Sequence, residues 1–345
     1  MKTSDFDYDL PQELIAQNPA EPRDHSRLML LSRDTGRTAH RRFYDLPDCL
    51  REGDLLVFND SRVFPARLYG RSYPSGHEIE MLLLSRLESG VWRALVRPGR
   101  RMRTGARFVV GGEDERSEAH GEVIGVEPSG SRRVRFESEP DLGKVGHIPL
   151  PPYIHERLRD NERYQTVYSS VEGSVAAPTA GLHFSKSLLC ELGEKGALFT
   201  FVTLHVGWDS FRPVTSENPS EHEMHSEQWE LSSEAANAIN AARDDGRRII
   251  SVGTTAVRLL ENAALMNRES GQLVSPGSGW VDLFISPGFE FKVIDGLVTN
   301  FHLPRSTLLM LVSAFAGRDN ILGAYATAVS EGYRFYSFGD AMLIH

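Results

Sequence analysis

Three histidines stand at positions where an α/β protein commonly places its ligands. His205 follows an apolar run in "TLHVG", His302 follows another in "TNFHLPRS", and His183 comes just before an expected helix. Ligands of open α/β sheets collect beyond the carboxyl ends of the strands, so the three side chains are expected to converge. Taken singly, each is equally well explained as a partly buried structural histidine. Together they favour a site for acid or base chemistry near neutral pH.

Two expected helix starts carry groups that suit an anion. In "SVGTT", Thr254 and Thr255 follow a strand, and free amides and hydroxyls at a helix start bind carboxylate or phosphate well. Plain N-capping by Thr254 or Thr255 is an equal alternative. In "TNFHLPRS", Arg305 stands at the next helix start, where it would clamp an anion or remain solvated.

The segment 173–186, "GSVAAPTAGLHFSK", carries no charge before Lys186. Its small residues allow a backbone to approach a ligand closely, and Thr179 and His183 are among its few polar side chains. Small-molecule pockets usually have such an apolar wall with few polar groups. The alternative is a tight buried crossover between domains.

A metal site is a weaker possibility. In "EHEMHSE", His222 and His225 are three residues apart and would share one face of a helix. The spacing defines no third ligand and Pro219 precedes the segment, so we expect no metal and favour a polar loop or proton transfer. The chain also lacks the phosphate-binding motifs G-x-x-x-x-G-K-[ST] and G-x-G-x-x-G.

A basic strip interrupts an acidic chain of net charge −9. The segment 93–107, "RALVRPGRRMRTGAR", contains no acid, and its central arginines are Arg97, Arg100, Arg101 and Arg103. A local basic strip on an acidic protein suits docking of one polyanion. A solvated hairpin balanced by the acids at 113–118 is the alternative.

The elements that must position these residues form two patterns. After residue 150, strands and helices alternate, which predicts an α/β domain with a largely parallel sheet. Between 71 and 146, short β-runs are separated by Gly, Pro and Ser, which predicts an inserted all-β barrel. We therefore expect a main α/β domain at 1–70 and 147–345, and a barrel domain at 71–146. The strands expected in the main domain lie at 54–60, 197–207, 247–253, 280–285, 296–303 and 333–344.

Composition sets the class of protein. The chain has 345 residues, of which 40% are hydrophobic and 25% charged, enough for about two globular domains. Its two cysteines, Cys49 and Cys190, are far apart, which fits a reducing compartment. The first residues have no apolar signal region, and no run approaches eighteen apolar residues. A cytoplasmic protein without membrane contact is expected.

Long motifs run in order over nearly the whole chain, among them "DLLVFNDSRVFPARLYG", "RYQTVYSSVEGSVAAPTAGLHF", "EHEMHSE", "ISVGTTAVRLLE", "TNFHLPRSTLLMLVSAFAG" and "YRFYSFGDAMLI". These motifs resemble the S-adenosylmethionine:tRNA ribosyltransferase-isomerases of queuosine biosynthesis. The resemblance implies an α/β fold with an inserted barrel. It also implies transfer of the ribosyl part of S-adenosylmethionine to 7-aminomethyl-7-deazaguanine at the wobble position of a tRNA. The sugar rearranges to give epoxyqueuosine, and adenine and methionine leave.

This chemistry suggests roles for the singled-out residues. The sulfonium acidifies its neighbouring C–H, so we expect His183 or His205 as the base and His302 as a helper in adenine departure. S-adenosylmethionine would be consumed as a co-substrate, with no metal, by a monomer. The expected substrate-binding residues are Thr179, Phe184, Arg212, Thr254, Thr255, Asn300 and Arg305, and the expected tRNA-binding residues are Arg97, Arg100, Arg101 and Arg103.

One departure from the family pattern is visible. After "VTLHVG" the family commonly has Gly-Thr-Phe, whereas this chain has Trp208-Asp209-Ser210-Phe211, which changes how closely the backbone can approach a ligand there.

Two other functions compete with the enzyme: a hydrolase with a metal at His222 and His225, and a tRNA-binding module without catalysis.

Overall fold

The computed structural model describes two compact units. The first comprises Met1–Ser61, Pro152–Val171 and Ala177–His345, and the second comprises Arg62–Pro151 and Glu172–Ala176. The expected insertion at 71–146 lies within the range of the second unit. The residues that the structure describes are 1–111, 118–156, 158, 160–208, 214, 216–222, 224, 226–267 and 271–345.

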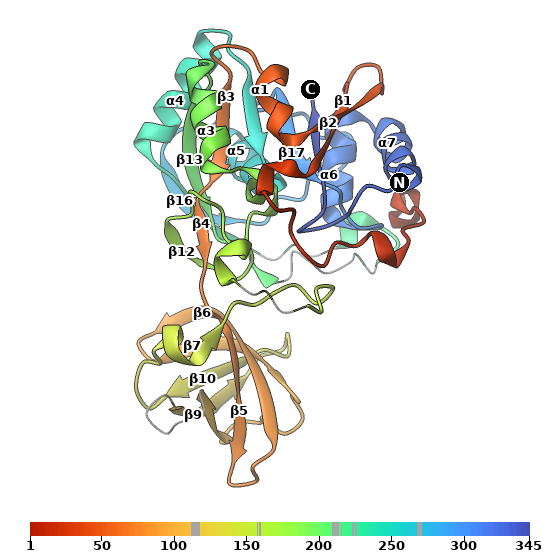
Figure 1. Ribbon diagram of the computed structural model, residues 1–345. Helices are drawn as coiled ribbons and strands as arrows, with labels where there is room; N and C mark the ends of the chain where they lie inside the picture. Colours follow the sequence, from red (N-terminus) through yellow and green to blue (C-terminus); the bar gives the residue numbers. More distant parts are fainter. Residues whose placement is uncertain are drawn as a thin grey trace. The chain divides into compact units, whose positions relative to one another are not determined.

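The first unit is built on a nine-stranded sheet (Figure 1). Its central strands are buried along their whole length, as expected for a sheet covered on both faces. From one edge to the other the strands are β16 (Gly277–Val281), β14 (Glu227–Leu231), β13 (Leu198–Leu204), β3 (Leu55–Asn59), β15 (Ile249–Val252), β17 (Gly296–Asn300), β18 (Ala341–Ile344), β1 (Arg27–Leu31) and β2 (Thr38–Arg42).

This sheet is mixed, so the expectation of a largely parallel sheet is not confirmed. The pairs β13–β3, β3–β15, β15–β17 and β18–β1 are parallel, and the other four neighbouring pairs are antiparallel. One reason lies in the connection from β17 to β18. It contains two helices, α6 (Thr307–Ala316) and α7 (Arg318–Ser330), and the second helix reverses the chain direction again, so β18 returns antiparallel.

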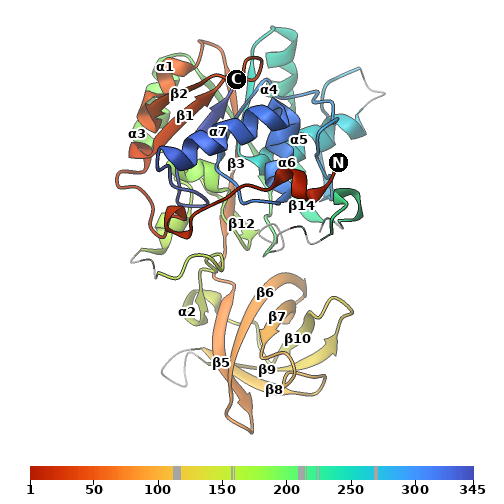
Figure 2. The same ribbon diagram turned by 90° about the vertical axis from the view of Figure 1, so that its right-hand side faces the viewer.

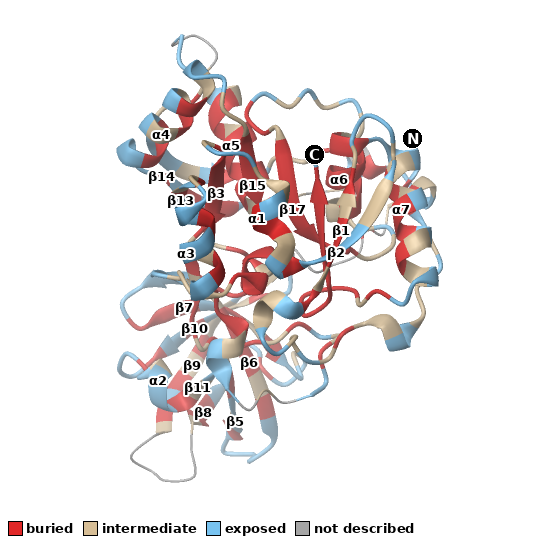
Figure 3. Ribbon diagram, turned by 45° about the horizontal axis from the view of Figure 1, so that its top comes forward, coloured by how far each residue is buried: buried red, intermediate tan, exposed pale blue. Residues whose placement is uncertain are grey.

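Helices cover both faces of this sheet (Figures 1 and 2). On one face, Leu56 and Phe58 of β3 share a buried cluster with Leu188 and Leu192 of α3 (Lys186–Glu194), and α1 (Leu46–Cys49) adds to it. The period of two turns the alternate residues of β3 to the other face. There α4 (Ser233–Asp244) and α5 (Thr254–Met266) contact β13 and β15. Figure 3 shows the resulting buried strands in red.

The second unit contains a closed six-stranded antiparallel barrel. The order is β5–β6–β7–β10–β9–β8, and β8 closes onto β5. At this closure Gly70 is required, because a Cβ there would lie 2.0 Å from the Val109 carbonyl oxygen. The bounds are β5 (Arg67–Tyr73), β6 (Glu78–Glu88), β7 (Val91–Arg97), β8 (Arg107–Gly111), β9 (Glu118–Val126) and β10 (Arg132–Phe136), with β11 (Gly146–His147) added to β5 and α2 (Leu142–Val145) before it. A separate two-stranded sheet pairs β4 (Ser61–Val63) with β12 (Val171–Ser174).

Two expected strands are largely wrong. The prediction at 333–344 holds only for β18, because Tyr336 has a φ of 74° and the chain turns there. The prediction at 280–285 meets only the end of β16. Within the described ranges, no helix is both long and apolar enough to cross a bilayer.

Candidate active site

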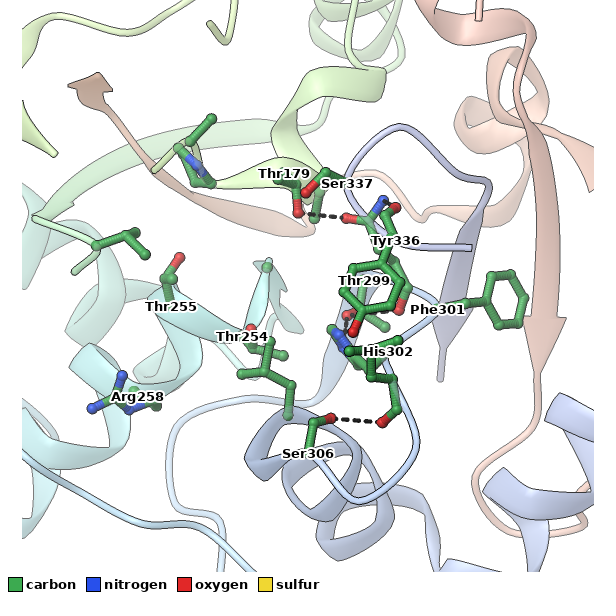
Figure 4. A pocket seen from close by; sticks show the side chains of 18 of the residues that line it. Thr179, Thr254, Thr255, Arg258, Thr299, Phe301, His302, Ser306, Tyr336 and Ser337 are labelled. Atoms are coloured by element: carbon green, nitrogen blue, oxygen red, sulfur yellow. Dashed lines mark hydrogen bonds between the residues drawn. The ribbon is translucent and has the colours of Figure 1, made fainter. Parts of the chain in front are cut away.

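A cavity lies at the carboxyl ends of β15 and β17, the edge where α/β sheets bind ligands (Figure 4). The empty space inside it, with the open solvent at its mouth included, is about 850 Å³. The loop after β17 contributes Phe301 and His302, and the start of α5 contributes Thr254 and Thr255. The short helix η7 (Thr179–His183), from the uncharged segment 173–186, contributes Thr179.

Asn300 organises one wall of this cavity. Its Oδ1 accepts a hydrogen bond from Thr179 Oγ1 (3.0 Å). Its Nδ2 donates to His183 Nε2 (3.0 Å) and to the Tyr336 carbonyl (3.2 Å). The amide of a buried residue is thereby fully oriented, and three segments distant in sequence meet at the end of β17.

His183 lies behind this wall and does not line the cavity. Because Nε2 accepts from Asn300, Nδ1 carries the hydrogen and donates to Ser26 Oγ (2.8 Å). The ring stacks on Phe43 with centroids 5.0 Å apart. Burial lowers the pKa of His183 to about 3, with Arg334 and Arg23 acting in the same direction. The imidazole is therefore neutral, with both nitrogens engaged.

His302 lines the cavity and is also neutral, because burial lowers its pKa to about 3. Its Nε2 lies 2.8 Å from Thr299 Oγ1, and the Thr299 hydroxyl donates to the Asn300 carbonyl (3.3 Å). Nε2 therefore carries the hydrogen. Within the described part of the chain, Nδ1 makes no hydrogen bond. Its lone pair is available to a ligand.

The start of α5 forms another wall. Gly253, with a φ of 91°, is the N-cap, and no side chain caps the helix, so the alternative of capping by Thr254 or Thr255 is wrong. Thr255 Oγ1 accepts from Asn59 Nδ2 (3.3 Å). The first amides of a helix lack intrahelical partners and lie at the positive end of its dipole. This wall therefore suits an anionic group of a ligand.

Arg258 also lines the cavity, and the sequence analysis missed it. Its guanidinium forms a buried ion pair with Glu227, and its Nε donates to the Leu283 carbonyl (3.2 Å). Glu227 also accepts from the Gly207 amide (2.9 Å). The sequence did contain a signal for Arg258: it follows Thr254 by four residues, so the two side chains lie on the same face of the helix.

Tyr336 was missed as well. Its hydroxyl is buried without a hydrogen-bond partner among the described residues, and its ring centroid lies 4.0 Å from that of Tyr153. The Tyr153 hydroxyl bonds Ser337 Oγ (2.6 Å). No signal marked Tyr336, since it fell inside an expected strand.

Other predicted site residues lie elsewhere. Phe184 packs in the core against Phe43 and Phe58. Arg305 is half-exposed, and its guanidinium lies 3.5 Å from the Glu217 carboxylate. His205 follows β13 outside the cavity, with a buried Nδ1 that has no partner in the described residues. Burial lowers the pKa of His205, against the opposing effect of Asp60 and Glu230.

Some predictions fall on residues outside the described ones: Arg212, Asp209 and Ser210, and His225 of the possible metal pair. Among the described residues, no group of three or more His, Cys, Asp and Glu side chains is placed to hold a metal ion.

The arginine strip lies in the second unit, on the end of β7 and the loop that follows. Arg97, Arg100, Arg101 and Arg103 are all exposed, and none forms an ion pair with a described residue. Arg93, in contrast, pairs with Glu127 (3.0 Å). Four cations at the end of one strand and on the loop after it, without an acidic partner among the described residues, suit a polyanion.

Comparison with known proteins identifies the family. The family model described as queuosine biosynthesis protein matches residues 3–344. The chain belongs to this queuosine biosynthesis protein family. Two curated relatives named S-adenosylmethionine:tRNA ribosyltransferase-isomerase are 53% identical (Acetivibrio thermocellus) and 54% identical (Moorella thermoacetica), over 100% of both chains in each case.

A solved structure agrees with this assignment to the queuosine biosynthesis protein family. The crystal structure of S-adenosylmethionine tRNA ribosyltransferase from Thermotoga maritima is 42% identical, with a TM-score of 0.56, and the match covers 99% of this chain and 100% of that one. The predicted family and enzyme class, a transferase of the S-adenosylmethionine:tRNA ribosyltransferase-isomerase type, are confirmed.

Proposed function

We propose that the protein transfers the ribosyl part of S-adenosylmethionine to 7-aminomethyl-7-deazaguanine at the wobble position of a tRNA. It isomerises the sugar to form epoxyqueuosine and releases adenine and methionine. The observation that carries this proposal is full-length identity above 50% to enzymes named for that co-substrate and for tRNA. The cavity at the strand ends is the proposed place for the co-substrate. In this proposal the enzyme is a cytoplasmic monomer and needs no metal.

His302 is the proposed base. Its Nδ1 lone pair is free within the described residues and lines the cavity. The sulfonium acidifies the adjacent C–H bond; when that bond breaks, the electron pair stays on carbon and the proton moves to Nδ1. The cavity holds one positive charge before and after the step, first on sulfur and then on the imidazole. Burial, which disfavours a lone imidazolium, therefore penalises the step little.

His183 and His205 have other places in this proposal. Both nitrogens of His183 are engaged, so it acts through Asn300 as a positioning residue. His205 lies outside the cavity and takes no part in proton removal. Burial lowers the pKa of His302 to about 3, so in the ligand-free protein it holds no proton for adenine and can donate one only after it has acted as the base.

The remaining polar walls hold the co-substrate. The α5 amides with Thr254 and Thr255 take the methionine carboxylate, since the positive end of a helix dipole favours an anion. Thr179 and Asn300 fix the opposite wall. Arg305 pairs with Glu217, so it needs release before it can bind substrate. Arg212 stays a prediction, and the exposed strip Arg97–Arg103 is the proposed contact with tRNA.

One experiment tests the reaction. The protein is mixed with S-adenosylmethionine and a tRNA carrying 7-aminomethyl-7-deazaguanine, and adenine, methionine and tRNA mass are followed. We expect stoichiometric release of both products and a matching gain in tRNA mass. Tight tRNA binding without release would contradict the proposal and favour a binding module. Product release only in the presence of added zinc or manganese would contradict the metal-free mechanism.

A further inference from the structure

The Tyr336 hydroxyl is a buried polar group that the proposed mechanism leaves unused. Tyr336 is 8% exposed, and its hydroxyl has no hydrogen-bond partner among the described residues. Buried polar groups of folded proteins nearly always have a partner. Among the described side chains that bear such an unpaired atom, only Tyr336 lines the cavity. Its missing partner is therefore expected on a ligand.

The backbone holds this side chain in place at the expense of strain. Tyr336 has a φ of 74°, a left-handed conformation rare for a bulky residue. Its amide donates to the Phe301 carbonyl (3.1 Å), and its carbonyl accepts from Asn300 Nδ2 (3.2 Å). These two contacts tie Tyr336 to the end of β17 and to the loop after it, which carries His302. Strained residues held this firmly cluster at functional sites.

The surroundings of Tyr336 suit a flat heteroaromatic ring. The Tyr153 ring lies beside it, and Pro178 and Leu303 line the same cavity. Figure 4 shows Tyr336 on the same side of the cavity as Thr299 and His302. Burial raises the pKa of the Tyr336 hydroxyl far above its usual range, so at neutral pH it is a donor.

We propose that the Tyr336 hydroxyl donates a hydrogen bond to N3 or N7 of the adenine of S-adenosylmethionine and so assists its departure. This inference rests on the proposed function. When the bond from the ribose carbon to N9 breaks, its electron pair passes to the purine, where N3 and N7 share the negative charge. The hydrogen bond strengthens at that moment, which is how a fixed donor accelerates a reaction. Tyr336 keeps its hydrogen, and the adenine finally takes up the proton that His302 removed from carbon.

The first test is Tyr336→Phe. We expect kcat for adenine release to fall about 100-fold, with a smaller change in KM, since the bond is made mainly in the transition state. The ligand-free protein loses no hydrogen bond to a described residue, so its Tm should be unchanged or higher. Tyr333→Phe is the matched control: its hydroxyl bonds His40 (2.7 Å) away from the cavity, and turnover should stay at the wild-type level.

The second test uses 1-deaza, 3-deaza and 7-deaza analogues of S-adenosylmethionine. With either the 3-deaza or the 7-deaza analogue, the wild type should lose about as much kcat as Tyr336→Phe does with the natural substrate. The variant should lose nothing further with that analogue, because the same bond is already missing. Wild-type kcat in the variant, or equal additional losses with all three analogues, would overturn the inference. Failure of the proposed function differs, since the wild type itself would then release no adenine.

Discussion

At the scale of single residues, two buried imidazoles of the same charge state have different surroundings. His183 uses both nitrogens, one toward Ser26 and one toward Asn300. His302 uses only Nε2 among the described residues. Burial alone therefore does not separate a structural histidine from a reactive one; the count of occupied nitrogens does.

The pH dependence of turnover tests the role of His302. Burial lowers the pKa of His302 to about 3, so the base stays unprotonated as pH falls through 6.5. We expect kcat/KM to show no loss between pH 7.5 and 5.5 from this group, measured as adenine release with the modified tRNA. An acidic limb with a midpoint near 6.5 that vanishes in His302→Gln would contradict this expectation.

Removing the His183 ring should destabilise the protein and also leave the Asn300 side chain less firmly oriented. His183→Ala leaves buried hydrogen-bonding groups of Ser26 and Asn300 unpaired and opens a cavity beside Phe43. We expect the free energy of unfolding to fall by about 2–4 kcal/mol, measured by urea denaturation. Ser26→Ala, which removes one of the two bonds, should cost less. Equal stability of wild type and His183→Ala would show that the network adds nothing.

At the scale of elements, the Glu227–Arg258 pair joins β14 to α5. Both side chains are about 95% buried, so removal of one charge leaves the other uncompensated. Glu227→Gln should lower the free energy of unfolding by about 3–5 kcal/mol in urea denaturation. The double variant Glu227→Gln, Arg258→Met should be more stable than the single one. A single variant as stable as the wild type would mean that Arg258 finds other partners.

Elements with a local signal were predictable. The apolar strand expected at 54–60 is confirmed as β3, and the helix expected after His183 is confirmed as α3. The Ser185 hydroxyl accepts from the Leu188 amide (3.1 Å) at the start of α3. Strand direction was not predictable, because it depends on how many helices a connection contains. The segment 333–340 is rich in aromatic residues, which favour strands, but the Tyr336 backbone bonds to Asn300 and Phe301 and the chain turns there.

Site residues with a local sequence signal were also predictable, and those without one were not. A strand end led to His302 and a strand–helix junction led to Thr254, and both line the cavity, as does Asn300, which was expected to bind substrate. Tyr336 could not be found this way, since its position depends on contacts between segments distant in sequence. Phe184 was expected to bind substrate but does not. The preceding residue, His183, lies behind the cavity wall, whereas the Phe184 side chain is buried in the core.

At the scale of the whole molecule, tRNA binding is the property to test. The triple substitution of Arg100, Arg101 and Arg103 by Ala should weaken affinity for the modified tRNA. The plot of log association constant against log salt concentration should become shallower, its slope smaller in magnitude by about 2–3. Fluorescence titration at several salt concentrations measures both. Arg86→Ala is the control on the same barrel, since Arg86 already pairs with Glu139 (2.9 Å). Unchanged affinity and slope in the triple variant would remove the strip from the interface.

The order of strands in the two sheets has a consequence for synthesis of the chain. Within the described part of the chain, the barrel strands β5 to β10 pair with one another and with β11, so these partners have been made by His147. Strand β3 ends at Asn59, yet its neighbours β13 and β15 begin at Leu198 and Ile249. At ordinary rates of translation, this apolar strand stays without its partners for on the order of ten seconds or more. That interval is when a ribosome-associated chaperone would have most to protect, and slower decoding between residues 59 and 198 would lengthen it.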